Sequence, residues 1–274
     1  MAELGIVDIR EIIRLIKSLY NYDFSSYALT SFKQRLERVM KMYALGSLDS
    51  LMRKLQDDAG FFDTFLFEMT VSSTEMFRDP SLWRWLREEF FPQQIDKNSG
   101  KFKIWLPLCV SGGELYSLAI LLHEIGMADK VQITASCISN KSIDLIRGGN
   151  YDAKKIEISE ENYKRFNGLK ELSAYYKPEK DYVVRNNSLI EQVEFKKLNI
   201  NFDSAPQNAK LILFRNALIY YNPALQEKIL QVLHGTLSVS GHLIIGIREK
   251  IPGLSTSKDF EFVNEAEGVY RKKY

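Results

Sequence analysis

The sequence predicts a doubly wound α/β domain that follows a helical domain and carries a small β insertion. From about residue 80 onward, short apolar strands alternate with amphipathic helices, which is typical of a parallel sheet with crossover connections. Before that point, apolar residues recur three and four apart, the period of a helix. We therefore expect a helical domain at 1–79 and an α/β domain at 80–274, with the insertion at about 152–197.

The individual elements follow from the same patterns. Turn and cap residues at 23–26 and 46–49 separate the N-terminal helices, and Gly60 breaks the next one. Beyond Pro92, the sequence predicts strands at 103–108, 131–137, 211–214 and 240–246, with helices near 115–126, 141–148 and 222–237. The stretch between Tyr151 and Phe195 fits neither period, and its short β-rich pieces favour a small β insertion.

Composition gives bounds rather than a function. The 274 residues, 45% of them hydrophobic, can build a full core, and cations exceed anions by only 37 − 35 = 2. Bulk charge thus gives no reason to expect nucleic acid as a partner. Cys109 and Cys137 stand in apolar contexts without metal-ligand spacing, so we expect buried free thiols and no metal. No window approaches the ~20 apolar residues of a spanning helix, so we expect a cytoplasmic protein with no membrane insertion.

The segment 104–117 predicts a ligand-binding turn. An apolar strand breaks at Gly112 and Gly113 and runs directly into a helix, so the backbone can approach a ligand closely. Glu114 offers a carboxylate at the helix start, which suits a cationic or hydroxyl-bearing ligand better than a pyrophosphate. An ordinary turn between strand and helix would give the same pattern.

Four segments in order, 70–80, 105–117, 132–151 and 211–221, resemble the CheR-type chemotaxis methyltransferases, which methylate receptor glutamates with S-adenosylmethionine. The first reads Thr-Val-Ser-Ser-Thr-Glu-Met-Phe-Arg-Asp-Pro, and the last contains Arg-Asn-Ala-Leu-Ile-Tyr-Tyr. The resemblance covers nearly the whole chain, including the ending Gly241 to Gly246 with Glu249. It implies a Rossmann-like methyltransferase domain and a protein-glutamate O-methyltransferase activity, with S-adenosylhomocysteine as product.

Site residues are carried over from the resemblance. It implies that the acceptor carboxylate is held by Arg78 and Tyr220, which supply a planar donor fork and one donor on a rigid ring. Asn199 and Ile200 would flank the adenine. The complete set expected at the cofactor is Ser72, Thr74, Arg78, Gly112, Glu114, Cys137, Asn199, Ile200, Arg215 and Asn216.

The resemblance also implies a partner, a methyl-accepting chemoreceptor or a similar signalling protein. A basic helix in the family meets the acidic methylation region of the receptor, which would suit Lys33, Arg35, Arg38 and Lys41. A solvated helix face is the alternative for these cations. Aromatic residues do not interleave with the charges, which disfavours nucleic acid. We expect a monomer. The family's insertion can dock receptor tail peptides by adding a strand to its sheet edge.

Departures from the family pattern keep a second function open. Cys137 stands where the family usually has an acidic residue that accepts both ribose hydroxyls, and Gly113 replaces a glutamate in the cofactor loop. Losing that carboxylate would cost ~1.5–3 kcal/mol of cofactor binding. The alternative to the enzyme is therefore a catalytically degenerate CheR-like domain that binds or scaffolds signalling proteins.

Overall fold

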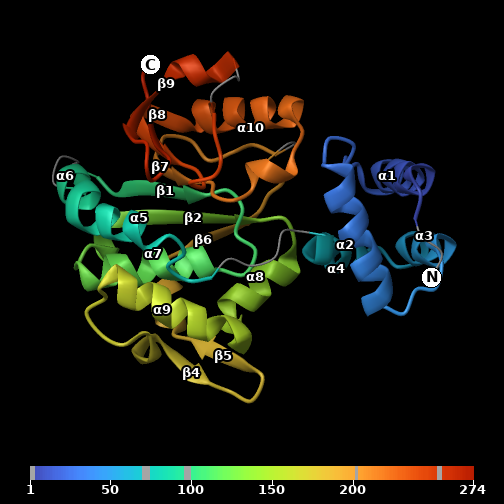
Figure 1. The fold of residues 1–274 in the computed structure, drawn as a ribbon, viewed down its shortest axis with the longest axis horizontal. Coiled ribbons are helices and arrows are strands. Elements are labelled where there is room, and N and C mark those ends of the chain that lie inside the picture. The colour runs from blue at the N-terminus through green and yellow to red at the C-terminus, as the bar shows by residue number, and fades with distance from the viewer. Residues whose placement is uncertain (1–3, 70–74, 96–99, 201–202, 252–254) are drawn as a thin grey trace.

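The N-terminal part is a bundle of four helices: α1 (Ile6–Tyr20), α2 (Leu29–Met42), α3 (Leu48–Asp57) and α4 (Ala59–Met69). The computed structural model describes residues 4–69, 75–95, 100–200, 203–251 and 255–274, so the predicted site residues Ser72 and Thr74 lie outside it. In α1, the isoleucines spaced three and four apart are buried in the bundle core, as their period predicts. Figure 1 shows the bundle beside the α/β domain.

The α/β domain is built on a seven-stranded sheet in the order β6-β2-β1-β7-β8-β10-β9. Its strands are β1 (Phe102–Leu106), β2 (Val131–Cys137), β6 (Glu194–Lys197), β7 (Ala209–Leu213), β8 (Leu237–Ile244), β9 (Phe260–Asn264) and β10 (Val269–Lys272). The first five run parallel, and β10 pairs antiparallel with both β8 and β9. The doubly wound prediction is confirmed, whereas β9 and β10 were not predicted.

Helices cover both faces of this sheet. The side chains of Phe102, Ile104 and Leu106 belong to one core cluster, and Trp105 between them belongs to the other. The first cluster packs under α5 (Pro80–Trp85), the π-helical turn η1 (Leu86–Phe90), α7 (Gly113–Glu124), α8 (Asn140–Arg147) and α9 (Ile156–Phe166). The short helix α6 (Phe91–Ile95) continues η1. The second cluster packs under α10 (Pro223–Thr236).

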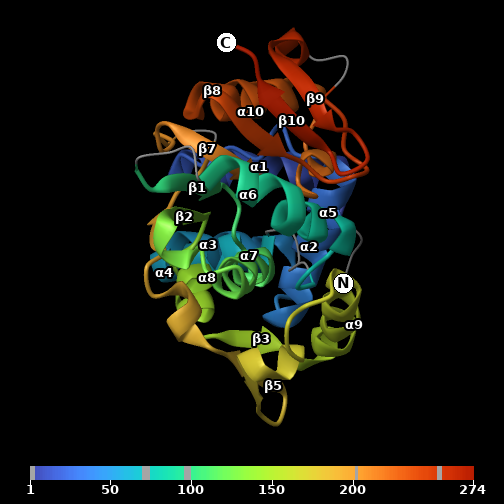
Figure 2. The same cartoon turned by 90° about the vertical axis from the view of Figure 1, so that its left-hand side faces the viewer.

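The insertion contains a separate three-stranded antiparallel sheet in the order β3-β5-β4. Its strands are β3 (Asn150–Asp152), β4 (Tyr176–Pro178) and β5 (Tyr182–Arg185). Figure 2 shows this sheet at the end of the molecule opposite the C-terminal strands. Although β6 lies inside the range expected for the insertion, it pairs parallel with β2 in the main sheet.

Short 3-10 turns complete the chain: η2 (Ala128–Lys130), η3 (Ala153–Lys155), η4 (Leu172–Tyr175), η5 (Asn187–Ile190), η6 (Leu218–Tyr220) and η7 (Ser255–Asp259). Within the described ranges, none of the helices has both the length and the apolar character needed to span a bilayer.

A buried histidine in β8 makes folding stability depend on pH. His242 is buried beside the Phe90 ring, and its desolvation, with Arg271 on the paired strand, lowers its pKa to about 4. Below about pH 6.5 the histidine becomes protonated in the unfolded chain but stays neutral in the folded chain. The contribution of His242 to the free energy of unfolding is therefore fully present above pH 6.5 and is lost as the pH falls toward 4. The pKa of His242 differs by 6.5 − 4 = 2.5 between the unfolded and folded states. The resulting loss in the free energy of unfolding is about 3 kcal/mol.

His242→Phe should therefore flatten the pH dependence of stability. Urea titrations of both proteins between pH 7 and pH 4 measure the free energy of unfolding directly. We expect the wild type to lose about 3 kcal/mol more than the variant over that range. Parallel losses in the two proteins would contradict the role of His242.

Candidate cofactor and acceptor site

Two loops meet at the carboxyl edge of the sheet, where open α/β sheets bind ligands. The loop after β1 leads through Gly112 into α7, and the loop after the neighbouring parallel strand β7 carries Arg215 and Asn216. Gly112 has a φ of 74°, and a Cβ there would lie 2.9 Å from the Ile146 side chain. The positive φ and the close Ile146 side chain therefore favour glycine at this turn. The close approach of a ligand, which the sequence predicted for this glycine, stays a prediction.

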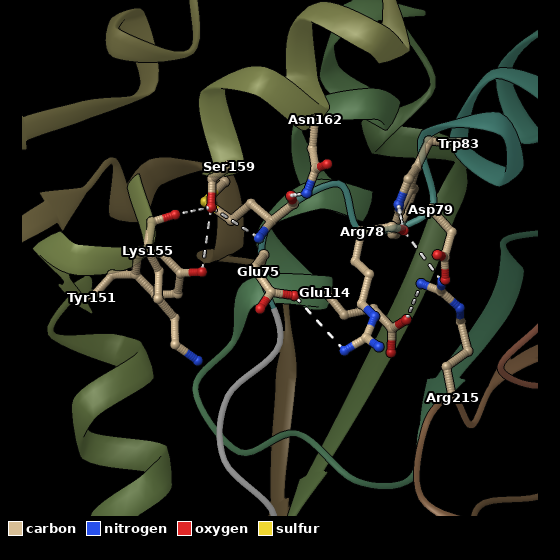
Figure 3. Close-up of polar contacts among 11 residues, drawn as sticks. Glu75, Arg78, Asp79, Trp83, Glu114, Tyr151, Lys155, Ser159, Asn162 and Arg215 are labelled. Carbon is tan, nitrogen blue, oxygen red and sulfur yellow. Dashed lines mark hydrogen bonds and ion pairs between the residues drawn. The ribbon is translucent and has the colours of Figure 1, made fainter. Parts of the chain in front are cut away.

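Arg215 is the centre of a charged cluster in this site (Figure 3). Its Nη1 donates to Glu114 Oε1 at 2.8 Å, and its Nη2 forms an ion pair with Asp79 Oδ2 at 2.5 Å. The same Nη2 donates to the backbone oxygen of Arg78 at 3.2 Å. Only 2% of the Arg215 side chain is exposed. The structure therefore joins three chain segments that lie far apart in the sequence.

The Arg215 guanidinium offsets part of the cost of burying the carboxylates of this cluster. Desolvation raises the pKa of Glu114, and the adjacent Arg215 guanidinium opposes part of that rise. Asp79 adopts a left-handed backbone, with a φ of 58°, directly before Pro80 at the start of α5. Asp79 was not among the predicted site residues. Its sequence signals were its position at a helix start and its place in the Phe-Arg-Asp-Pro end of the segment 70–80.

Arg78 projects from the segment 75–79, which α7 and α9 hold in place. The backbone amides of Met76 and Phe77 donate to Ser159 Oγ at 3.2 Å and to Ser117 Oγ at 2.7 Å. The side chain of Arg78 is 42% exposed, and its Nη1 lies 3.8 Å from Glu75 Oε2. Figure 3 shows it between the side chains of Glu75 and Glu114. Arg78 is therefore a reachable cation at the site.

A buried carboxylate fixes the loop that carries Asn216 and Tyr220. Glu249 Oε2 accepts hydrogen bonds from the backbone amides of Asn216 at 2.8 Å and Gly246 at 2.7 Å, and Oε1 accepts from the amide of Ile219 at 3.4 Å. Burial raises the pKa of Glu249, while these backbone donors lower it. The resemblance gave Glu249 no role, and the structure shows that it anchors this loop.

The amide nitrogen of Asn216 points to an absent partner. Its Nδ2 is buried and has no hydrogen-bond partner in the described part of the chain. Asn216 itself has a φ of 58°, and Gly246 leaves room for its Oδ1, which would lie 2.8 Å from a Cβ at that position. Buried polar groups are normally hydrogen-bonded, so this amide is available to donate to a ligand oxygen.

Cys137, which stands where the resemblance expects a ribose-binding carboxylate, is enclosed by the protein. It is the last residue of β2 and is fully buried, and the neighbouring Cys109 thiol together with burial raises the Cys137 pKa well above its usual range. Both cysteines are free. Their burial agrees with the sequence prediction. Among the described residues, no group of three His, Cys, Asp or Glu side chains could hold a metal.

Asn199 and Ile200 line a small cavity of about 20 Å³ between the sheet edge and the helical bundle, together with Tyr220 and Arg35. A larger cavity of about 330 Å³ lies between α7 and η5, and no predicted site residue lines it. The residues of the charged cluster line neither cavity. We assign the site to the carboxyl edge of the sheet, because the charged cluster and the ends of the two loops lie there.

The four cationic side chains of α2 differ in exposure and in the groups that they contact. Arg38 and Lys41 are exposed, and Lys33 lies 3.8 Å from Glu37 one turn along the helix. Arg35 instead turns toward the α/β domain, where its guanidinium carbon lies 4.7 Å from the centre of the Tyr220 ring. Arg35 therefore contacts the candidate site rather than lying on an open helix face with the others.

Two family models match this chain, one in each of its domains. Residues 7–70 match the family model described as the CheR methyltransferase all-alpha domain, and residues 72–269 match the CheR methyltransferase SAM-binding domain. These matches identify an S-adenosylmethionine-dependent methyltransferase. The chain belongs to the CheR family of chemotaxis methyltransferases, and S-adenosylmethionine is its cofactor.

Relatives share most of their length with this chain. The Pseudomonas putida protein Cher3 is 30% identical over 266 residues, covering 97% of each chain. Chemotaxis protein methyltransferase 1 of Pseudomonas aeruginosa is 28% identical over 253 residues, covering 87% of this chain and 88% of the relative. The N-methyltransferase NodS from Bradyrhizobium japonicum is similar in structure with a TM-score of 0.36 at 11% identity, over 72% of this chain and 99% of NodS.

Proposed function

We propose that this protein transfers the methyl group of S-adenosylmethionine to glutamate side chains of a methyl-accepting chemoreceptor or a similar signalling protein. The products would be a glutamate methyl ester and S-adenosylhomocysteine. The convergence of Arg78, Glu114 and Arg215 in one charged cluster at the sheet edge carries this proposal. We propose the cytoplasm as the compartment of this protein.

Four of the residues present, Gly112, Glu114, Arg78 and Asn216, suit the cofactor. Gly112 lets the backbone approach it closely, and the Glu114 carboxylate suits its ammonium group. The exposed guanidinium of Arg78 suits its carboxylate, and the unsatisfied Asn216 amide can donate to a cofactor oxygen. When bound, S-adenosylmethionine supplies an electrophilic methyl group on a sulfonium.

The acceptor needs no general base, because a glutamate side chain with a pKa near 4.3 is already ionised at neutral pH. In the transfer, one carboxylate oxygen would form a bond to the methyl carbon as the carbon–sulfur bond broke. The acceptor would lose its negative charge together with the positive charge on sulfur, and no proton would move. Orientation must then supply most of the rate, and we assign Arg78 and Tyr220 to holding the acceptor carboxylate.

A second candidate function is a degenerate CheR-like domain that binds signalling proteins without turnover. The packing of Cys137 favours it, because a thiol buried against Cys109 offers the ribose no carboxylate oxygens. The affinity for S-adenosylmethionine and S-adenosylhomocysteine separates the two candidates, and calorimetry measures it.

Cys137→Asp should tighten S-adenosylmethionine binding by roughly tenfold to a hundredfold, because it restores two charged acceptors for the ribose hydroxyls. Without bound cofactor, the Cys137→Asp variant should be less stable than the wild type, since its carboxylate would be buried against Cys109. Cys137→Asn is the matched control, with the same shape but no charge, and it should tighten binding much less. Absence of binding in all three proteins would contradict the enzyme and favour the binding module.

A further inference from the structure

The helical bundle is joined to the loop that carries Tyr220 by main-chain hydrogen bonds. The amide of Ala28 donates to the Tyr220 oxygen at 3.1 Å, and the amide of Asn222 donates to the Ser26 oxygen at 3.1 Å. Tyr27 and Tyr221 thereby form an isolated antiparallel bridge. The segment before α2 thus fixes the backbone on which Tyr220 stands.

Aromatic packing backs the same contact. The Tyr27 ring meets the Tyr221 ring edge to face, with centroids 5.1 Å apart and planes at 88°. Phe24, fully inside the bundle core, packs edge-on against Tyr27 with centroids 4.9 Å apart. This chain of rings connects the core of the bundle to the loop, so the loop cannot shift without disturbing the bundle.

Arg35 supplies a side-chain contact to Tyr220 itself. Its guanidinium carbon lies 4.7 Å from the ring centre, within the range of a cation–π interaction. Its Nη1 also donates to the backbone oxygen of Met69 at 2.9 Å, at the end of α4. The guanidinium is therefore fixed from one side by the bundle and covers one face of the Tyr220 ring from the other.

We propose that Arg35 is a positioning residue for methyl transfer, which holds the Tyr220 ring so that its hydroxyl meets the acceptor carboxylate. This role rests on the proposed function of Tyr220. It differs from the receptor contact expected of Arg35 from the sequence, because a guanidinium stacked on Tyr220 and bonded to Met69 is engaged inside the protein. The helical bundle then forms part of the active site as well as being a candidate docking domain.

The test uses the full chain, tritiated S-adenosylmethionine and a signalling-domain fragment of a chemoreceptor from the same organism as acceptor. Arg35→Gln should lower kcat by about tenfold, because a cation–π contact of this kind is worth about 1–2 kcal/mol. The KM for the acceptor and the affinity for S-adenosylhomocysteine should stay unchanged. Arg35→Lys keeps a cation over the ring and should recover part of the lost rate.

Arg87→Gln is the matched control. Arg87 also stacks on a ring, with its guanidinium carbon 4.5 Å from the centre of Phe166, and it donates to a backbone oxygen, that of Asn167 at 2.7 Å. Arg87 is not part of the site, so the kcat of the Arg87→Gln variant should equal that of the wild type. A double-mutant cycle of Arg35→Gln with Tyr220→Phe should show strong non-additivity, because Arg35 acts through Tyr220.

Two results would overturn the role of Arg35 while leaving the proposed function intact: an unchanged kcat of Arg35→Gln, or additive effects in the double-mutant cycle. An unchanged kcat with a raised KM for the acceptor would assign Arg35 to receptor binding. An inactive wild type would instead overturn the proposed function and this role with it. Thermal unfolding and S-adenosylhomocysteine binding confirm that each variant is folded, and Arg35→Lys provides the comparison if Arg35→Gln is unstable.

Discussion

Arg215→Met is expected to destabilise the protein by about 3 kcal/mol and to abolish cofactor binding, because it leaves two partly buried carboxylates without their cation. Glu114 and Asp79 are only 18% and 19% exposed, and both pair with Arg215. Without it, they would repel each other across the cofactor loop. Urea unfolding measures the stability, and titration with S-adenosylhomocysteine measures the binding.

The destabilisation by Arg215→Met should also grow with pH. Burial raises the pKa of Glu114 and Arg215 opposes that rise, so removing Arg215 raises the folded-state pKa further. A carboxyl group with a raised folded pKa favours folding at low pH, and that contribution is lost as the pH rises through the folded value. The variant should therefore lose more stability at pH 7 than at pH 5. A loss that shrank toward pH 7 would contradict the assigned pairing.

The matched control is Arg271→Met. Arg271 pairs with Glu261 at 2.6 Å, but the two side chains are 47% and 41% exposed. Water screens such a pair, so its loss should cost no more than about 1 kcal/mol. Similar losses at Arg215 and Arg271 would mean that the buried cluster has no special role in stability.

Tyr220→Phe is expected to lower kcat by about a hundredfold or more, because it removes one fixed donor to the acceptor carboxylate and leaves the ring in place. Affinity for S-adenosylhomocysteine should not change. Tyr182→Phe removes the same hydroxyl from an exposed tyrosine, 44% accessible on β5, and should leave kcat unchanged. Equal rates for the wild type and Tyr220→Phe would exclude Tyr220 from the acceptor site.

The spacing of hydrophobic residues predicted much of the fold, because most strands in the core are continuous apolar runs. β1 and β2 read as apolar runs and were located to within a few residues. β9 and β10 were missed because both are short and mix apolar with polar residues, reading Phe-Glu-Phe-Val-Asn and Val-Tyr-Arg-Lys, without a strict alternation of buried and exposed side chains. β6 was assigned to the insertion because its Lys196 and Lys197 hid its pairing with β2.

The site was predicted less completely than the fold, for a different physical reason. Glu114 and Arg215 could be named from the resemblance, and the structure brings them together. The pairing of Arg215 with Asp79 joins residues 136 positions apart, which no local pattern reveals. The turning of Arg35 toward Tyr220 likewise depends on how the helical bundle packs on the α/β domain.

The central claim is that this chain methylates glutamate side chains, and the most direct measurement follows tritium from S-adenosylmethionine into a receptor fragment. The account predicts label that alkali releases as methanol, which is the behaviour of a carboxyl methyl ester, and predicts that replacing the acceptor glutamates with alanine abolishes it. Cofactor binding without any alkali-labile label on receptor fragments from the same organism would contradict the account and leave a CheR-like binding domain.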